Sequence, residues 1–178
     1  QEQQDLVASK AIAGICPTTE ANLGDGVFPT AEFLALNGTF AIGSDSHISV
    51  NPIEELRWLE YAQRLTKQQR AILASSETLS VGQNLWQKAA CGGAQSTNAN
   101  SGVLSVGKQA DLLVLDEKQT RLFANNNQHL LDSVIFASQK NTIKDVMVNG
   151  QWVVQNGKHP EEQSSADNFA KLLTKLSN

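Results

Sequence analysis

Asp45 is the residue of this 178-residue chain whose position most favours chemistry. It follows the apolar run 39–43 after a single serine, and His47 stands two residues further on. In parallel α/β folds, ligands bind at the carboxyl ends of the strands. A carboxylate there can bind a divalent metal, take a proton from metal-bound water, or do both. Aspartate also often caps turns, and the pattern leaves both interpretations open.

A polar segment at residues 18–26 is the second candidate. It follows another apolar run, residues 11–16, so we expect a loop that borders the same pocket as Asp45. The side chains considered for substrate contact in the two loops are Thr19, Glu20, Asn22, Asp25, Ser46 and His47. The segment is also rich in residues that favour turns, which leaves a purely structural role open. Its glycines are too few and too poorly spaced for a phosphate-binding loop, and the serines near Asp45 lack the Gly-x-Ser-x-Gly pattern of serine hydrolases.

The three histidines do not supply a metal site by themselves. His129 and His159 lie in stretches that are expected to be exposed in a β-rich part. No two histidines have the spacing of metal ligands. His47 alone is explained as well by a polar loop residue as by a ligand, so this chain does not predict a complete metal site.

Two strand–helix units position the candidate loops. Residues 11–16 and 39–43 are short continuous apolar runs, typical of strands that are buried on both faces. A helix is expected to follow the first unit's loop, with Pro29 in its first turn and an end near Leu36, before Asn37-Gly38. Strands and helices that alternate in this way predict a parallel α/β fold.

The helix of the second unit has the clearest start signal. Asn51 is a good N-cap, Pro52 suits the first helical position, and Glu54 stands three residues after the cap. Four residues at helical spacing predict the face that packs on the core. They are Trp58, Tyr61, Ala62 and Leu65.

Beyond residue 100 the pattern changes from strand–helix to strand–turn. A third helix is predicted over 81–95, a strand over 110–116 and a hairpin over 145–154 that turns at Asn149-Gly150. We expect a solvated loop at 125–127, a short helix over 130–136, and a last amphipathic helix with a capping box at Ser164 and Asp167. The apolar face of that last helix carries Phe169, Leu172, Leu173 and Leu176.

Composition excludes several classes of protein. The net charge is −4 and the pI about 5.3, without a run rich in Lys or Arg, so nucleic acid is not an expected partner. No apolar run approaches a membrane span, and the polar start lacks the pattern of a signal peptide, so a cytoplasmic protein is expected. Cys16 and Cys91 are expected to be buried free thiols. Residues 2–10 read as the end of a helix that runs directly into a strand, which favours a truncated chain.

Several segments together resemble the formiminoglutamate deiminases of the amidohydrolase superfamily. The narrowest matches are Thr-Glu-Ala-Asn-Leu-Gly-Asp-Gly at 19–26 and Glu-Glu-Leu-Arg-Trp-Leu-Glu-Tyr at 54–61. Ile-Gly-Ser-Asp-Ser-His at 42–47 and Gly-Gly-Ala-Gln at 92–95 also match. The Gly-x-x-Ala-Asp-Leu strand at 107–112 and the Asn-Gly hairpin are widespread in the superfamily, so they indicate only that broader group.

The resemblance implies the C-terminal portion of a TIM-like (β/α)₈ barrel. Residues 1–100 would hold its last two strand–helix units, 101–160 part of a small β-sandwich, and 161–178 a C-terminal helix. Asp45 would match the aspartate after the eighth strand, which binds one divalent metal, usually zinc, and shuttles a proton from the bound water. The metal histidines and the glutamate that assists proton transfer would lie upstream of Gln1, so this chain alone is expected to be inactive.

The activity implied is hydrolysis of the formimino group of N-formimino-L-glutamate, a small-molecule substrate, to the formyl group and ammonia. Two alternatives stay open. One is another amidohydrolase that acts on a cyclic amidine or amide, such as guanine or cytosine deaminase or an imidazolonepropionase. The other is a non-catalytic α/β remnant in which Asp45 only caps a turn. The oligomeric state is also open, a homodimer included.

Overall fold

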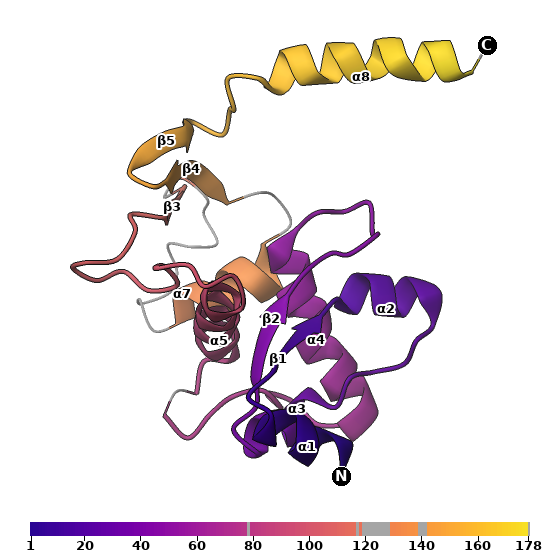
Figure 1. Cartoon of the computed structure of the whole chain (residues 1–178), viewed down its shortest axis with the longest axis vertical. Coiled ribbons are helices and arrows are strands. Elements are labelled where there is room, and N and C mark those ends of the chain that lie inside the picture. The colour runs from indigo at the N-terminus through magenta and orange to yellow at the C-terminus, as the bar shows by residue number, and fades with distance from the viewer. Residues whose placement is uncertain (78, 117, 119–128, 139–141, 178) are drawn as a thin grey trace. The chain divides into compact units, whose positions relative to one another are not determined.

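A computed structural model describes residues 1–77, 79–116, 118, 129–138 and 142–177, so the loop expected at 125–127 lies outside the described residues. The chain divides into two compact units (Figure 1). The elements of the first unit are α1 (Glu2–Ala8), β1 (Ile12–Ile15), α2 (Pro17–Leu23), α3 (Thr30–Ala35), β2 (Thr39–Ile42), α4 (Pro52–Lys67), α5 (Val81–Ser96), α7 (Leu130–Asp132) and the π-helix η2 (Ser133–Ala137). Those of the second unit are β3 (Leu112–Leu115), β4 (Ile143–Val148), β5 (Gln151–Val154) and α8 (Glu162–Leu176).

The predicted strand pair of the first unit is confirmed. β1 and β2 are parallel, with Ile12 opposite Thr39 and Ile15 opposite Ile42. The prediction that the strand is buried on both faces is wrong for β1, because Gly14 is exposed whereas its neighbours Ala13 and Ile15 are buried. In a pleated strand alternate residues point to opposite faces, so β1 presents one face to the core and leaves the other open.

Helix α4 starts where the sequence predicts, but it buries a different face. Asn51 accepts hydrogen bonds from the backbone N–H groups of Ile53 and Glu54, at 3.0 and 3.4 Å. The predicted core face is wrong, since Trp58 and Leu65 are 41% and 75% exposed. The residues that α4 buries are Ile53, Glu55, Leu56, Leu59, Glu60 and Gln63.

Polar side chains on the buried face of α4 explain the error. The Glu60 carboxylate accepts hydrogen bonds from the backbone N–H groups of Ile72 (3.1 Å) and Leu73 (2.9 Å), and from Arg64 Nε (2.6 Å). Buried polar groups are tolerated when they are hydrogen-bonded in this way. An apolar periodicity counts only hydrophobic residues, so it selected a face whose residues are half-buried, as Tyr61 and Ala62 are, or exposed, as Trp58 and Leu65 are.

Helix α5 packs along β2, and Gly92 permits the close approach (Figure 1). A Cβ atom at Gly92 would stand 1.8 Å from the carbonyl oxygen of Phe40, which is shorter than any nonbonded contact. A Cβ atom at the next residue, Gly93, would meet no atom within 4 Å. Helix α5 continues through both glycines to Ser96, so Gly92 serves packing and does not end the helix.

The segment α7–η2 belongs to the first unit, although it follows the expected boundary at residue 100. It packs against α4 and α5, and its Val134 and Ile135 are fully buried. Arg57 of α4 donates hydrogen bonds to the carbonyl oxygens of Ile135 (2.5 Å) and Ser138 (3.1 Å). The boundaries 1–100, 101–160 and 161–178 stay a prediction for the division of the whole protein.

The second unit contains the predicted hairpin. β3, β4 and β5 are antiparallel in that order, and the turn at Asn149-Gly150 has φ values of 49° and 78°. Two successive positive φ values are what an Asn-Gly hairpin turn requires. Helix α8 begins at Glu162, so Ser164 lies inside it and the predicted capping box is wrong. None of the helices in the described part of the chain has the length and apolar character of a membrane span.

Paired alanine substitutions test the packing of α5 on β2. Gly92→Ala should lower the free energy of unfolding by about 1–3 kcal/mol, because the new methyl group overlaps the backbone of β2. Gly93→Ala is the matched control and should raise it by up to about 1 kcal/mol, because alanine is the better helix former. Urea denaturation followed by circular dichroism measures both, and equal stabilities of the two variants would contradict the close contact.

Candidate functional site

The segment at 18–26, predicted as a loop, is mostly helical. Helix α2 runs from Pro17 to Leu23 and ends at Gly24, whose φ of 76° is the left-handed conformation of a helix C-terminus. Glu20 folds back so that its carboxylate accepts a hydrogen bond from the N–H of Cys16, at 2.8 Å. The signals for this helix were present in Pro17 at the first helical position and in Gly24 at the end.

Glu55, which the sequence analysis did not single out, holds the start of α2. This carboxylate of α4 is 1% exposed and accepts hydrogen bonds from the backbone N–H (3.0 Å) and the hydroxyl (2.5 Å) of Thr18. Locally, Glu55 resembles any acidic residue in the first turn of a helix. Thr18 and Glu55 are 37 positions apart in the sequence, which leaves no local signal for the pairing.

Asp45 lies on a turn directly after β2, as predicted. The turn is closed by a hydrogen bond from the N–H of His47 to the carbonyl oxygen of Ser44, at 3.0 Å. Asp45 is exposed and has a φ of 48°, which is uncommon for a residue with a side chain. Its carboxylate is therefore accessible to a ligand.

Thr19 joins α2 to this turn. Its hydroxyl donates to the carbonyl oxygen of Ser44 (2.6 Å) and accepts from the N–H of His47 (3.1 Å). The side chain is buried, with 3% of the residue exposed. Thr19 is thus brought to the Asp45 turn, as the sequence suggested, but it contacts the backbone of that turn.

The remaining candidate side chains differ in their exposure and in their hydrogen bonds. His47 is half-buried, and its Nδ1 lies 3.2 Å from the backbone nitrogen of Ser49, which donates to it, and 2.9 Å from the Ser49 hydroxyl oxygen. Ser46 is exposed beside Asp45, and Asn22 and Asp25 are exposed on and after α2. The Glu20 carboxylate is engaged in holding the start of α2.

The thiol of Cys16 reports on the electrostatics around this turn. Burial raises the pKa of Cys16, and the negative charges of Asp45, Glu20 and Glu55 raise it further. A Cβ atom added at Gly43 would lie 3.4 Å from Cys16 Sγ, so the ends of β1 and β2 meet here. Both cysteines are free, as predicted, but the expected burial is wrong for Cys91, which is exposed on α5, and only partly met by Cys16, which is half-buried.

The described residues do not assemble a metal site by themselves. Across 1–77, 79–116, 118, 129–138 and 142–177, no group of three or more His, Cys, Asp or Glu side chains is placed to hold an ion. A structural or catalytic zinc site needs at least three protein ligands. The part of the chain that the structure describes therefore does not complete a metal site.

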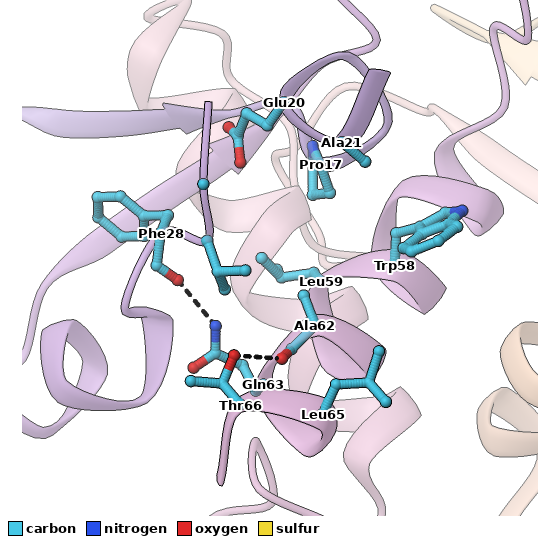
Figure 2. Close-up of a pocket in the computed structure, with 12 residues that line it drawn as sticks. Pro17, Glu20, Ala21, Phe28, Trp58, Leu59, Ala62, Gln63, Leu65 and Thr66 are labelled. Carbon is cyan, nitrogen blue, oxygen red and sulfur yellow. Dashed lines mark hydrogen bonds between the residues drawn. The ribbon is translucent and has the colours of Figure 1, made fainter. Parts of the chain in front are cut away.

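A pocket of about 170 Å³ lies elsewhere in the first unit, against α4 (Figure 2). Trp58, Ala62 and Leu65, which were expected in the core, contribute to its mostly apolar wall. Of the candidate residues, Glu20 lines this pocket whereas Asp45 does not. A polar substrate that reacts at Asp45 is therefore not expected to occupy it.

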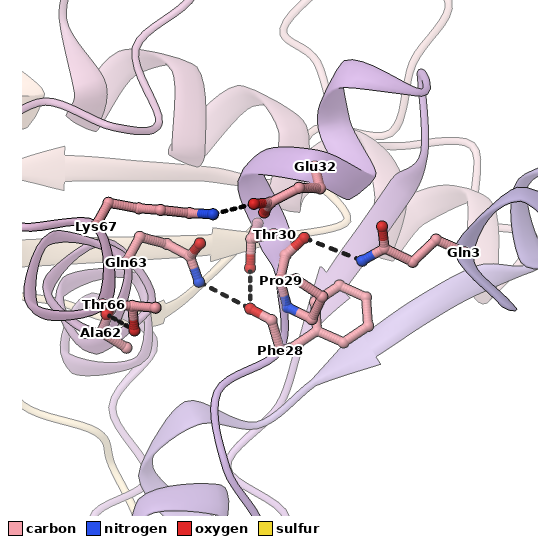
Figure 3. Close-up of polar contacts among 9 residues, drawn as sticks. All are labelled: Gln3, Phe28, Pro29, Thr30, Glu32, Ala62, Gln63, Thr66 and Lys67. Atoms are coloured by element: carbon pink, nitrogen blue, oxygen red, sulfur yellow. Dashed lines mark hydrogen bonds and ion pairs between the residues drawn. The ribbon is translucent and has the colours of Figure 1, made fainter. Parts of the chain in front are cut away.

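Polar contacts with α4 hold both the segment between α2 and α3 and helix α3 itself (Figure 3). Gln63 is buried and donates a hydrogen bond to the carbonyl oxygen of Phe28 at 2.8 Å, and Lys67 forms an ion pair with Glu32. Pro29, expected in the first turn of the helix, is the N-cap residue of α3. These contacts hold the segment after α2 independently of the Asp45 turn.

Comparison with known proteins identifies the family. The sequence model of the amidohydrolase family matches residues 3–153. The chain belongs to the amidohydrolase family. Over 171 residues this amidohydrolase chain is 46% identical to the formimidoylglutamate deiminase of Pseudomonas aeruginosa, an alignment that covers 96% of the chain and 38% of that protein. It is 26% identical over 174 residues to a 5-methylthioadenosine/S-adenosylhomocysteine deaminase of Pyrococcus abyssi, covering 97% of the chain and 40% of the relative.

Solved structures confirm the predicted fold class. An amidohydrolase from Brucella melitensis superposes with a TM-score of 0.89 at 38% identity, over 99% of this chain and 39% of that one. An adenosine deaminase from Xanthomonas campestris with bound zinc superposes at 0.82 with 19% identity, over 99% of this chain and 40% of the other, which shows likeness of fold alone. This amidohydrolase chain spans about two fifths of the length of the relatives it matches.

Alkylation of Cys16 tests its closeness to Asp45. In a Cys91→Ser background, iodoacetamide should modify Cys16 slowly at pH 8.5, and the rate should rise with pH, because the raised pKa keeps the thiol protonated. Asp45→Asn removes a negative charge, so it should lower the Cys16 pKa and speed up alkylation at that pH. Asp25→Asn, an exposed change outside the groups that act on Cys16, is the control and should leave the rate unchanged. An Asp45→Asn rate equal to that of the Cys91→Ser parent would contradict the electrostatic contact.

Proposed function

We propose that this chain forms part of a metal-dependent deiminase that hydrolyses N-formimino-L-glutamate to N-formyl-L-glutamate and ammonia. The observation that carries the proposal is an exposed Asp45 carboxylate at the carboxyl end of β2, in a chain that is 46% identical to a formimidoylglutamate deiminase across 171 residues. The activity is proposed for the enzyme that contains this chain, which is called the complete protein below.

The reaction is a substitution of nitrogen by oxygen at the formimino carbon. The oxygen of one water molecule bonds to that carbon, and Asp45 accepts a proton from the water as it attacks. Asp45 passes this proton to the imino nitrogen, which becomes an amino group. The second proton of the water, now on the added hydroxyl group, then moves through Asp45 to the same nitrogen, so the carbon–nitrogen bond breaks and ammonia leaves as the formyl carbon–oxygen double bond forms. One water is consumed, and Asp45 returns to its ionised form.

A divalent metal, usually zinc in this family, would supply the activation of that water when bound. Asp45 is the described residue that we assign to it as a ligand. The remaining ligands must come from residues other than those described, since the described part holds no cluster of three. This division agrees with the share of about two fifths that the chain covers in its relatives.

Replacing Asp45 separates its charge from its role in the turn. Asparagine adopts positive φ values readily, so Asp45→Asn should preserve the turn and change the free energy of unfolding by less than about 1 kcal/mol. In the complete protein it should lower kcat for N-formimino-L-glutamate by about 10²–10⁴-fold, the usual contribution of a general base. Ammonia release in a coupled assay measures the rate, with Asp167→Asn on the exposed helix α8 as the control.

The outcomes also distinguish the alternatives. A complete protein that leaves N-formimino-L-glutamate unchanged but deaminates 5′-methylthioadenosine or a cyclic amidine would overturn the substrate assignment. Full activity of Asp45→Asn would support the remaining interpretation, in which Asp45 only caps a turn.

Metal content provides a further test. The 178-residue chain by itself should bind well below one zinc per molecule after dialysis and should show no turnover, because a single carboxylate is too few ligands. Mixing it with the N-terminal part of the Pseudomonas protein should raise zinc towards one per complex and restore turnover. Stoichiometric zinc together with activity in the chain alone would disprove this division of the site.

A further inference from the structure

The Thr19 hydroxyl donates to and accepts from the backbone of the Asp45 turn. A hydroxyl has one proton to donate, and Thr19 donates it to the carbonyl oxygen of Ser44 at 2.6 Å. The oxygen also accepts the N–H of His47 at 3.1 Å. Thr19 was predicted as a candidate for substrate contact, but donation of this proton to a substrate would break the first of these bonds. Because Thr19 is buried and hydrogen-bonded to this backbone, it supports the turn and is not placed to bind a substrate.

The two bonds enclose Asp45. Ser44 precedes it and His47 follows it by two residues, and a third hydrogen bond joins these two backbone groups at 3.0 Å. Asp45 itself has a φ of 48°, so the turn holds a conformation that side-chain-bearing residues adopt rarely. Such a conformation persists when surrounding contacts enforce it. Thr19 provides that enforcement from a different element.

The position of Thr19 is set in turn by Glu55. Its neighbour Thr18 donates two hydrogen bonds to this buried carboxylate, at 3.0 and 2.5 Å, which fix the start of α2 on α4. Thr19 is therefore carried by a helix start that is anchored to the core and not by a loose loop. The Asp45 turn is connected to the core of the first unit through Thr19.

We propose that Thr19 is a positioning residue for the Asp45 carboxylate. It acts through the backbone of Ser44 and His47, without contact to the substrate. This inference rests on the proposed function for its catalytic consequence, but the holding of the turn is independent of it. A displacement of about 1 Å in a catalytic group can cost about 10²-fold in rate, so release of the turn should affect chemistry more than binding.

Three substitutions in the complete protein test the role. Thr19→Val has a similar shape but lacks the hydroxyl, and it should lower kcat about 10–100-fold with KM changed less than about threefold. Thr19→Ser restores the hydroxyl and should return kcat to within about threefold of wild type. Thr30→Val is the matched control, since Thr30 is also buried and donates to a backbone carbonyl, that of Phe28, but does not contact the Asp45 turn. It should leave kcat unchanged.

Hydrogen–deuterium exchange of the peptide that covers residues 44–49 gives a readout that does not need a substrate. Thr19→Val should speed exchange there, whereas Thr19→Ser and Thr30→Val should not. If wild type exchanges as expected but does not act on N-formimino-L-glutamate, the proposed function fails while the exchange result still decides whether Thr19 holds the turn. In that case the kcat comparison is made on the substrate that the protein does use.

The contrary outcomes are specific. Unchanged exchange and an unchanged kcat in Thr19→Val overturn the proposal, as does a loss that Thr19→Ser fails to restore or that Thr30→Val reproduces. If Thr19→Val does not fold, Thr19→Ala takes its place. Failure of both to fold would make the residue structural and would also overturn the positioning role.

Discussion

The candidate site depends on the hydrogen bonds that Thr18 donates to the buried carboxylate of Glu55. Ionised groups are costly to remove from water, and they are retained inside proteins when hydrogen bonds satisfy them. Glu55 receives the backbone N–H and the hydroxyl of Thr18, which ties the first turn of α2 to the middle of the first unit. Glu20 completes this arrangement by accepting the N–H of Cys16, the residue that joins β1 to α2. The direction in which the chain leaves β1 is therefore set by two carboxylates.

This anchoring has a consequence at the end of the neighbouring strand. Because β1 and β2 are parallel and paired in register, the segments that follow them leave the sheet at the same edge. The first of these segments is a fixed helix start, and the second is the turn that carries Asp45. A single buried hydroxyl, that of Thr19, bridges them. An exposed acidic side chain is in this way presented on a supported backbone, which is the arrangement that proton transfer requires.

Polar residues also organise the core more than the composition suggests. The buried face of α4 carries Glu55, Glu60 and Gln63 beside its leucines, and each polar side chain pairs with backbone groups of another segment. Hydrogen bonds of this kind specify one arrangement of segments, because a shift by one residue would leave a buried group without its partner. The apolar residues Trp58 and Leu65 are left on the outside, where they line a pocket that is separate from Asp45.

The sequence by itself determined the features that depend on neighbours within a few residues. The Asn51-Pro52 start of α4, the Asn149-Gly150 turn, the parallel strand–helix pattern and the place of Asp45 after β2 were all predictable, because capping, turn geometry and short apolar runs are local properties. Tertiary structure decided the helical state of residues 17–23, the buried face of α4 and the use of the Thr19 hydroxyl. These depend on pairs such as Thr18 with Glu55 and Thr19 with Ser44, which are 37 and 25 residues apart. Local pattern cannot show which polar groups will be buried together, since the identity of the partner is known only once the chain has folded.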